Sequence, residues 1–265
     1  MIKYNTPQEL FTAICDKIRD KTNSNELINH QDIPDKIDNL VDSDIINEYN
    51  SAKNLIMSNS SIPNIFTDDT IKILQLSFPF NSILQKINLP ECTSIGSGYA
   101  FYNCTSLTIV DLPKCTSIGT KAFKQCINLT TVNLPECTSI DYGAFDRCTS
   151  LTTVNLHKCS SIDNYAFANC TSLTTIDLPE CTSIVDSAFY GCTNLTTIIL
   201  SSNQVVTLNN INAFTNSPIA NGSGYIYVPD NLVDSYKTAT NWSTYANRIK
   251  PISELPSELK EEYNL

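Results

Sequence analysis

The chain has 265 residues, of which 42% are apolar and 17% charged, and its formal net charge is −10 at pH 7. With 17 Lys and Arg against 27 Asp and Glu, it lacks the positive charge with which proteins hold nucleic acid or an anionic membrane surface. No apolar stretch approaches the ~18 residues of a membrane span, so we expect neither nucleic-acid binding nor membrane insertion. The sequence MIKYNTPQELF lacks the pattern of a secretory signal, and KEEYNL is no anchor motif.

Residues 1–57 are predicted to form a small helical module. The sequence Thr6-Pro7-Gln8-Glu9 is a capping box with proline at the first helical position, and apolar residues follow it at helical spacing. Further short helices are expected over residues 33–41 and 44–57. This module is either an attachment or oligomerisation unit, or else a mobile arm or a packed cap.

Residues 58–83 are predicted to be a degenerate first repeat that serves as an N-terminal cap. The sequence TIKILQLSF resembles a repeat strand, but only eight residues separate Leu76 from Leu84, too few for a full coil.

Residues 84–200 contain a repeat of 22 residues, with one coil of 23. The unit reads L-x-x-V-x-L-P-x-C-x-S-I-x-x-x-A-F-x-x-C-x-x, and its copies begin at Leu84, Leu107, Leu129, Leu151, Leu173 and Leu195. A fixed period of this length is typical of a solenoid, in which one unit cannot bury its apolar face alone.

Alternation within each unit predicts which side chains point inward. In LTTVNLP, Val132 and Leu134 are expected inside a strand and Thr131 and Asn133 outside, and Pro135 ends the strand because it has no N–H to donate. The returning half of the unit is expected to point Ile, Ala and Phe inward. Stacked units then form a parallel sheet with strands about 4.8 Å apart.

The chain has 11 cysteines, and ten of them lie in the repeats at a spacing of eleven residues. They form two columns, one after and one before each strand, and the strand holds the columns too far apart for a disulfide. Side chains within one column point the same way, so we expect free, buried thiols. The spacing offers no close cysteine pair for zinc, and we expect no metal site and no cofactor.

The runs AFDRCTSLTTV (144–154) and AFANCTSLTTI (166–176) resemble the BspA-like leucine-rich repeats of bacteria and some protists. The sequence YIYVPDNLVDSYKTATNWSTYANRIKPISEL (225–255) is similar to the terminal cap of such proteins. The resemblance implies an α/β fold: a leucine-rich repeat solenoid with a parallel β-sheet, a short helical N-terminal module and a C-terminal cap. It also implies a role in adhesion or protein binding.

Residues 201–265 are predicted to form an irregular last repeat and this C-terminal cap. Ala213-Phe214 keeps the A-F positions of the repeat although both cysteines are lost. We expect a final strand over 225–228 and a short helix over 229–240. Trp242 and Tyr245 are expected to pack over the open end of the solenoid.

No nucleotide-binding, metalloprotease or serine-hydrolase motif occurs in the sequence, so we predict that the chain is not an enzyme. A binding role would use one of two sets of outward residues. The sheet face would present Thr131, Asn133, Thr153, Asn155, Thr175 and Asp177. The returning segments would present Tyr99, Tyr102, Tyr142, Arg147, Tyr165 and Tyr190, either as recognition anchors or as unconstrained residues of a solvated face.

Three roles remain open at this stage. The first is a module for adhesion or recognition at a bacterial surface that binds a protein or a glycan. The second is a tail-associated structural or host-recognition protein of a phage or prophage virion. The third is a cytosolic scaffold. The expected lack of a signal and an anchor favours the second role, whereas the family resemblance favours the first.

Overall fold

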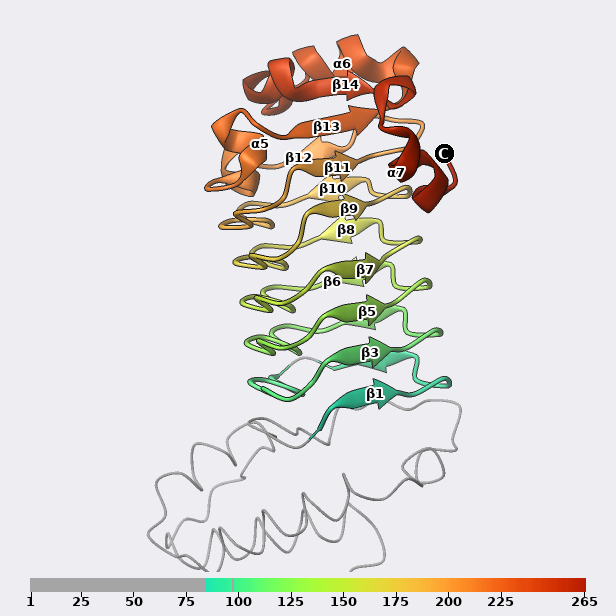
Figure 1. The fold of residues 1–265 in the computed structure, drawn as a ribbon, viewed down its shortest axis with the longest axis vertical. Coiled ribbons are helices and arrows are strands. Elements are labelled where there is room, and N and C mark those ends of the chain that lie inside the picture. The colour runs from blue at the N-terminus through green and yellow to red at the C-terminus, as the bar shows by residue number, and fades with distance from the viewer. Residues whose placement is uncertain (1–83, 97) are drawn as a thin grey trace, which may run out of the picture.

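The computed structural model describes residues 84–96 and 98–265, and the predictions for residues 1–83 lie outside this part of the chain. The described residues form a stack of similar coils that ends in a C-terminal cap (Figure 1). Each coil consists of a front strand, a turn, a short back strand and a returning segment that leads to the next front strand. The predicted leucine-rich repeat solenoid with parallel strands is therefore confirmed.

The front strands make one long face of the stack, which we call the front sheet. They are β1 (Lys86–Asn88), β3 (Ile109–Asp111), β5 (Thr131–Asn133), β7 (Thr153–Asn155), β9 (Thr175–Asp177), β11 (Thr197–Ile199), β13 (Tyr225–Val228) and β14 (Ile249–Pro251). All pairs are parallel, and the register places equivalent repeat positions side by side. The face consists of two four-stranded sheets, β1-β3-β5-β7 and β14-β13-β11-β9, because β7 and β9 are not hydrogen-bonded to each other.

The opposite side of the stack carries a second parallel sheet, the back sheet, which the sequence did not predict. Its strands are β2 (Ser94–Ile95), β4 (Ser117–Ile118), β6 (Ser139–Ile140), β8 (Ser161–Ile162), β10 (Ser183–Ile184) and β12 (Thr207–Leu208). Two-residue strands are too short to show a period of alternation. They form because stacking places each Ser-Ile pair beside its copy in the next coil, and this six-stranded sheet is continuous.

Side chains from each coil fill the space between the two sheets, as the alternation predicts. Val132, Leu134, Ala144 and Phe145 are fully buried, and Ile140 is 1% exposed. One phenylalanine per coil stacks on the next with nearly parallel rings, at centroid distances of 5.2 to 5.9 Å. This column extends through the core to Phe214, which confirms that Ala213-Phe214 occupies the A-F positions.

The ten repeat cysteines are buried free thiols, as predicted, and Cys15 lies outside the described residues. They also donate hydrogen bonds: Cys137 Sγ lies 3.2 Å from the carbonyl of Ser139, and Cys148 Sγ lies 3.2 Å from that of Phe123. Burial raises the pKa of the Cys137 thiol to about 12, so it stays protonated at neutral pH. The thiols therefore satisfy backbone carbonyls inside the coil.

The C-terminal cap closes the last coil. It contains α5 (Pro218–Asn221), α6 (Val233–Thr238), α7 (Ser257–Tyr263) and the 3₁₀ helices η1 (Ile211–Phe214), η2 (Asp230–Leu232), η3 (Trp242–Arg248) and η4 (Ile252–Glu254). Trp242 and Tyr245 contact Phe214 with ring centroids at 6.0 and 5.4 Å, which confirms that they cover the open end.

Polar side-chain groups of the cap form hydrogen bonds with the backbone at the free edge of the back sheet. Trp242 Nε1 donates to the carbonyl of Val206 at 2.6 Å, and Asn241 Nδ2 donates to that of Leu208 at 2.7 Å. The Tyr236 hydroxyl accepts from the N–H of Val206 at 3.0 Å. Side chains thus replace the missing next strand, since a buried strand edge needs partners for its backbone groups.

Two predictions for this region are wrong in detail. The strand at Tyr225–Val228 forms as predicted, but it is not the final one, because β14 pairs with it in parallel. The alternation that places Asn133 and Asp177 outward also predicts an outward Ile199, but Ile199 is fully buried. It packs with Tyr227 and Leu255, and α7 lies over this cluster through Leu259 and Tyr263. The C-terminal segment therefore covers Ile199 and Tyr227 of the front sheet, and Figure 1 shows α7 beside the right-hand ends of the upper front strands.

Candidate binding surface

The two predicted sets of binding residues lie on different faces. The Thr, Asn and Asp set belongs to strands β5, β7 and β9 of the front sheet. The tyrosines and Arg147 belong to the returning segments, which run along the left flank of the stack in Figure 1. The structure therefore provides two separate candidate surfaces instead of one combined site.

The returning segments carry an exposed row of side chains that we call the tyrosine ridge: Tyr99, Lys121, Tyr142 and Tyr165. The three tyrosines are 39 to 41% exposed. Lys121 Nζ donates to the hydroxyl of Tyr99 at 2.9 Å and lies 5.5 Å from the ring centroid of Tyr142. The Tyr142 and Tyr165 rings meet edge to face at 5.9 Å. The hydrogen bond with Tyr99 raises the pKa of Lys121, so the ridge carries a positive charge at neutral pH.

Three ridge residues have left-handed backbone conformations. Tyr99, Lys121 and Tyr165 have φ of 62°, 57° and 56°, and the equivalent residue of the coil between the last two is Gly143, with φ of 58°. A left-handed conformation costs a residue with a Cβ about 1–2 kcal/mol, whereas glycine adopts it without strain. The coil geometry thus favours glycine at this position, and the chain places large side chains there.

The other predicted residues of this flank are less prominent. Tyr102 is half-buried and meets the ring of Tyr99 edge to face at 5.2 Å, and Tyr190 is also half-buried. Arg147 is exposed and has φ of 62°. Beside it, Lys124 and the buried Asp146 form an ion pair at 2.7 Å, and neither residue belongs to the predicted binding set. This pair links adjacent coils, and a sequence scan for opposite charges one repeat apart would have found it.

Asparagines connect the polar side chains of the front sheet. Asn155 Nδ2 donates to Asn133 Oδ1, and Asn133 Nδ2 donates to Asp111 Oδ1, both at 2.8 Å. Thr131 and Thr175 are half-buried and Thr153 is exposed. We call the column of side chains at this strand position (Asp111, Asn133, Asn155 and Asp177) the asparagine column. Its last member is Asp177, whose buried Oδ1 has no hydrogen-bond partner. Burial raises the pKa of Asp177 to about 6.

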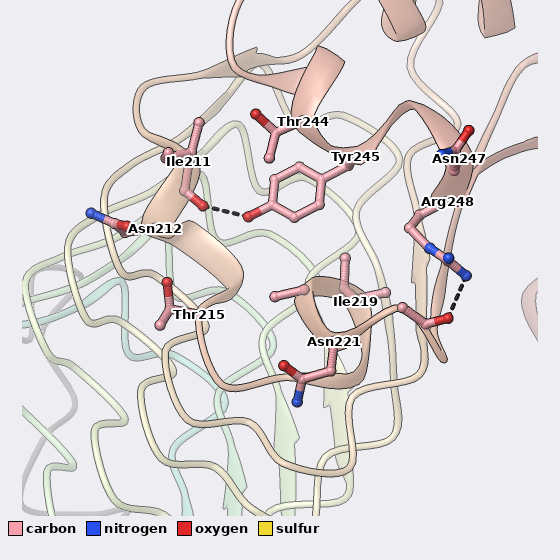
Figure 2. Close-up of a pocket in the computed structure, with 11 residues that line it drawn as sticks. Ile211, Asn212, Thr215, Ile219, Asn221, Thr244, Tyr245, Asn247 and Arg248 are labelled. Atoms are coloured by element: carbon pink, nitrogen blue, oxygen red, sulfur yellow. Dashed lines mark hydrogen bonds between the residues drawn. The ribbon is translucent and has the colours of Figure 1, made fainter.

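Two hollows of the cap are packing seams. One, of 420 Å³, lies between η1, α5 and η3 (Figure 2). Figure 2 shows the Tyr245 hydroxyl donating to the carbonyl of Ile211, and Arg248 donating to the carbonyl of Gly222. These donors hold the cap segments together. A second hollow, of 590 Å³, is lined by residues 205–209 and 239–242, where Trp242 and Asn241 bind the edge of the back sheet.

Residues 84–96 and 98–265 contain no group of three or more His, Cys, Asp and Glu placed to hold a metal ion. The helices among the described residues are all too short or too polar to cross a membrane.

A family model described as the BspA-type leucine-rich repeat region matches six copies in residues 35–114 and 93–221, which is more than half of the chain. The chain belongs to this BspA-type family. The predicted resemblance is thereby confirmed, and the first match begins upstream of the described coils. No protein with a curated description matches the chain.

Solved structures of leucine-rich repeat proteins are similar to this one. A protein from Bacteroides ovatus ATCC 8483 is 27% identical with a TM-score of 0.51, and the match covers 66% of this chain but only 44% of that protein. A protein from T. pallidum is 24% identical with a TM-score of 0.41, covering 57% and 80% of the two chains. A leucine-rich cell surface protein from Faecalibacterium prausnitzii A2-165 is 21% identical with a TM-score of 0.27, covering 56% and 62%.

Proposed function

We propose that this BspA-type chain is a non-enzymatic recognition module that binds a protein or glycan partner through the tyrosine ridge, at a bacterial surface. The observation that carries the proposal is the backbone strain beneath the ridge. Tyr99 and Tyr165 have left-handed conformations that favour glycine, yet both are large aromatic residues with exposed rings. Strained residues that persist on a rigid scaffold are characteristic of functional positions.

The ridge has the chemistry of a binding surface. Tyrosine offers a large apolar ring and a hydroxyl with few rotatable bonds, so little conformational entropy is lost on binding. The Lys121 ammonium lies 5.0 Å from the ring centroid of Tyr99 and 5.5 Å from that of Tyr142, within the range of cation–π attraction. Flat aromatic faces suit both the apolar faces of sugars and the anchor residues of a protein partner.

The test is a triple substitution, Tyr99→Ser, Tyr142→Ser and Tyr165→Ser. The wild-type chain would be screened against an array of surface glycans and a library of extracellular protein domains, and its hits measured with the variant. We expect at least a hundredfold loss of affinity. A matched control, Glu136→Gln with Lys158→Gln, removes an exposed ion pair outside the ridge and should leave affinity unchanged. Unchanged binding by the triple variant would refute the proposal.

The virion and scaffold roles remain predictions from the sequence. Neighbouring genes distinguish them, because a tail-assembly cluster would support the virion role and a secretion or sortase locus would contradict it. Oligomerisation through residues 1–57 is likewise a separate proposal, tested by deleting that module and measuring the mass in solution.

A further inference from the structure

The front sheet is interrupted at one place, between β7 and β9. Continued register would pair Thr153 with Thr175 and Asn155 with Asp177, but β7 and β9 belong to separate sheets. The back strands of the same coils, β8 and β10, are paired, and the phenylalanines stack across the level at 5.6 Å. The coil is therefore opened on one face only, and Figure 1 shows the wider step between the arrows of β7 and β9.

The hydrogen bonds of the threonine hydroxyls are interrupted at the same level. The hydroxyl of Thr152 donates to the carbonyl of Thr130 at 3.2 Å, and that of Thr196 donates to the carbonyl of Thr174 at 3.3 Å. Among the described residues, the hydroxyl of Thr174 makes no such bond with Thr152. Val154 is half-buried, whereas its equivalents Val132 and Ile176 are at most 1% exposed.

A cavity of 320 Å³ opens at this interruption. Its wall consists of residues 152–157, from β7 and the turn after it, together with Asp177 and residues 262–264 at the end of α7. Glu262 contributes a second carboxylate, and Tyr263 contributes a ring. The volume lies at the lower end of the range for small-ligand sites.

The direction of the amide hydrogen bonds explains why the side-chain hydrogen bonds of the asparagine column stop between Asn155 and Asp177. The column runs Asp111, Asn133, Asn155, Asp177, with two amides between two carboxylates. Each amide can donate toward only one neighbour in the column, so two amides cannot satisfy three gaps. In this structure both amides donate toward Asp111, so an oxygen of Asn155 faces the level of Asp177. Flipping both amides would move the conflict to Asp111 and would not remove it.

From this arrangement we infer that the cleft between β7 and β9 is a binding site for a guanidinium group. A guanidinium only donates hydrogen bonds, and its planar fork can serve the Asn155 amide oxygen and the Asp177 carboxylate together. Glu262 adds a second negative charge, and the Tyr263 ring supplies a face over which a cation can rest. The guanidinium comes from an arginine side chain of a partner or from a free alkylguanidine.

This site lies on the front sheet and does not involve the tyrosine ridge, so its test is independent of the proposed function. The probes are N-acetyl-arginine-methylamide, agmatine and the neutral isostere N-acetyl-citrulline-methylamide. Each would be titrated into the ¹⁵N-labelled full chain, and amide shifts near Val154 and Asp177 would be followed. We expect both guanidinium probes to bind and the citrulline probe to bind at least tenfold more weakly. Tighter binding of the arginine peptide than of agmatine would identify a partner side chain as the source, and the reverse would identify a free ligand.

Matched variants inside and outside the column decide the matter. Asp177→Asn lets residue 177 donate to Asn155, so it should complete the column and weaken binding at least tenfold. Glu180→Gln removes the same charge from an exposed position outside the column and outside the cavity wall, so it should change affinity less than twofold. Glu262→Gln should weaken binding severalfold. Equal losses in the Glu180 and Asp177 variants, or no shifts with either guanidinium probe, would overturn the inference.

The pH dependence provides a further check. The titratable groups that face Asp177 are His157 in the turn after β7 and Glu262 and Tyr263 from α7. Since a cation needs the ionised carboxylate, affinity should fall about tenfold between pH 7 and pH 5. His157→Gln should keep this dependence, and Asp177→Asn should abolish it. A dependence that disappears with His157→Gln would contradict the role assigned to Asp177.

Discussion

The back sheet and the front sheet are built from the same repeat, yet the back sheet runs without a break and the front sheet is split between β7 and β9. Beside the back strands, hydroxyl groups link each coil to the one before: Thr138 to Thr116, Ser160 to Thr138 and Thr182 to Ser160, at 2.9 to 3.1 Å. Each hydroxyl donates to a backbone carbonyl, which every coil supplies.

The front sheet relies in part on bonds between side chains. Its asparagine column needs a donor on every level, and Asp177 is an acceptor while it is ionised. The difference teaches that a ladder from side chain to side chain can be interrupted by one residue, and that the hydroxyl-to-carbonyl bond between Thr174 and Thr152 on the same face is then lost as well.

The largest expected effect is at the end of the back sheet. Trp242→Ala would remove the ring that covers Phe214 and the donor that binds the carbonyl of Val206. We expect a loss of about 3–5 kcal/mol in the free energy of unfolding, measured by urea denaturation. Ile211→Ala in the same cap alters a side chain of a residue that is 45% exposed and should lose much less. Similar losses for both variants would contradict the conclusion that Trp242 closes the end of the stack by covering Phe214 and donating to Val206.

The second prediction concerns a substitution that should pair β7 with β9 in the front sheet. Asp177→Asn should stabilise the protein by about 1–3 kcal/mol at pH 7, because burial raises the pKa of Asp177 and penalises its ionised form. The folded state holds this proton more tightly than the unfolded state. The wild type is therefore relatively more stable below about pH 4 and loses that stability as pH rises through about 6.

The advantage of Asp177→Asn over the wild type should accordingly disappear below about pH 4. Hydrogen exchange at Val154 and Thr175 should slow in the variant as β7 and β9 pair. Glu180→Gln, which removes an exposed charge outside the column, is the control and should change neither exchange rate. Unchanged exchange in the Asp177 variant would show that charge alone does not separate the strands.

A third prediction concerns a substitution that should weaken the back sheet in the coil where β7 and β9 are unpaired. Cys159→Ala would remove a buried thiol that donates to the carbonyl of Ser161 at 3.4 Å. We expect a loss of about 1–2 kcal/mol from the cavity and the unpaired carbonyl together. Thermal unfolding would measure it, with Cys115→Ala, away from the split, as the reference. A larger loss at Cys159 would show that the back sheet bears the strain of the opening, and equal losses would exclude this.

The smallest effect concerns neither sheet. Tyr165→Asn should raise the free energy of unfolding by up to about 1 kcal/mol, because asparagine adopts the left-handed conformation more readily than tyrosine. The same variant should bind a ridge ligand less tightly. Chemical denaturation measures the first quantity. A destabilised variant would mean that the Tyr142 contact outweighs the backbone strain.

Several elements could be predicted from the sequence because one coil repeats many times. The inward positions Val132, Leu134 and Phe145 and the free thiols follow from period and spacing, and the structure confirms them. The strand over Tyr225–Val228 and the packing of Trp242 were also predictable, since a solenoid end must be covered.

Other features had no signal in the sequence. The segments LTTVNL and LTTIDL differ only at Val154/Ile176 and Asn155/Asp177, and both read as the same front strand. Whether the two strands pair depends on the direction in which the amides of the asparagine column donate. That direction is set at Asp111, two coils from Asn155. Similarly, Ile199 looks outward in its strand, and only the return of α7 buries it.

The sequence by itself determined the coil: its period, its inward residues, its free buried thiols and the need for a cap. These follow from local alternation and from the requirement that each unit bury its apolar face against a copy. Only the tertiary structure decided the paired back sheet, the gap between β7 and β9 and the covered upper front face. Those depend on hydrogen-bond polarity and packing between residues 22 or more positions apart, which no single repeat contains.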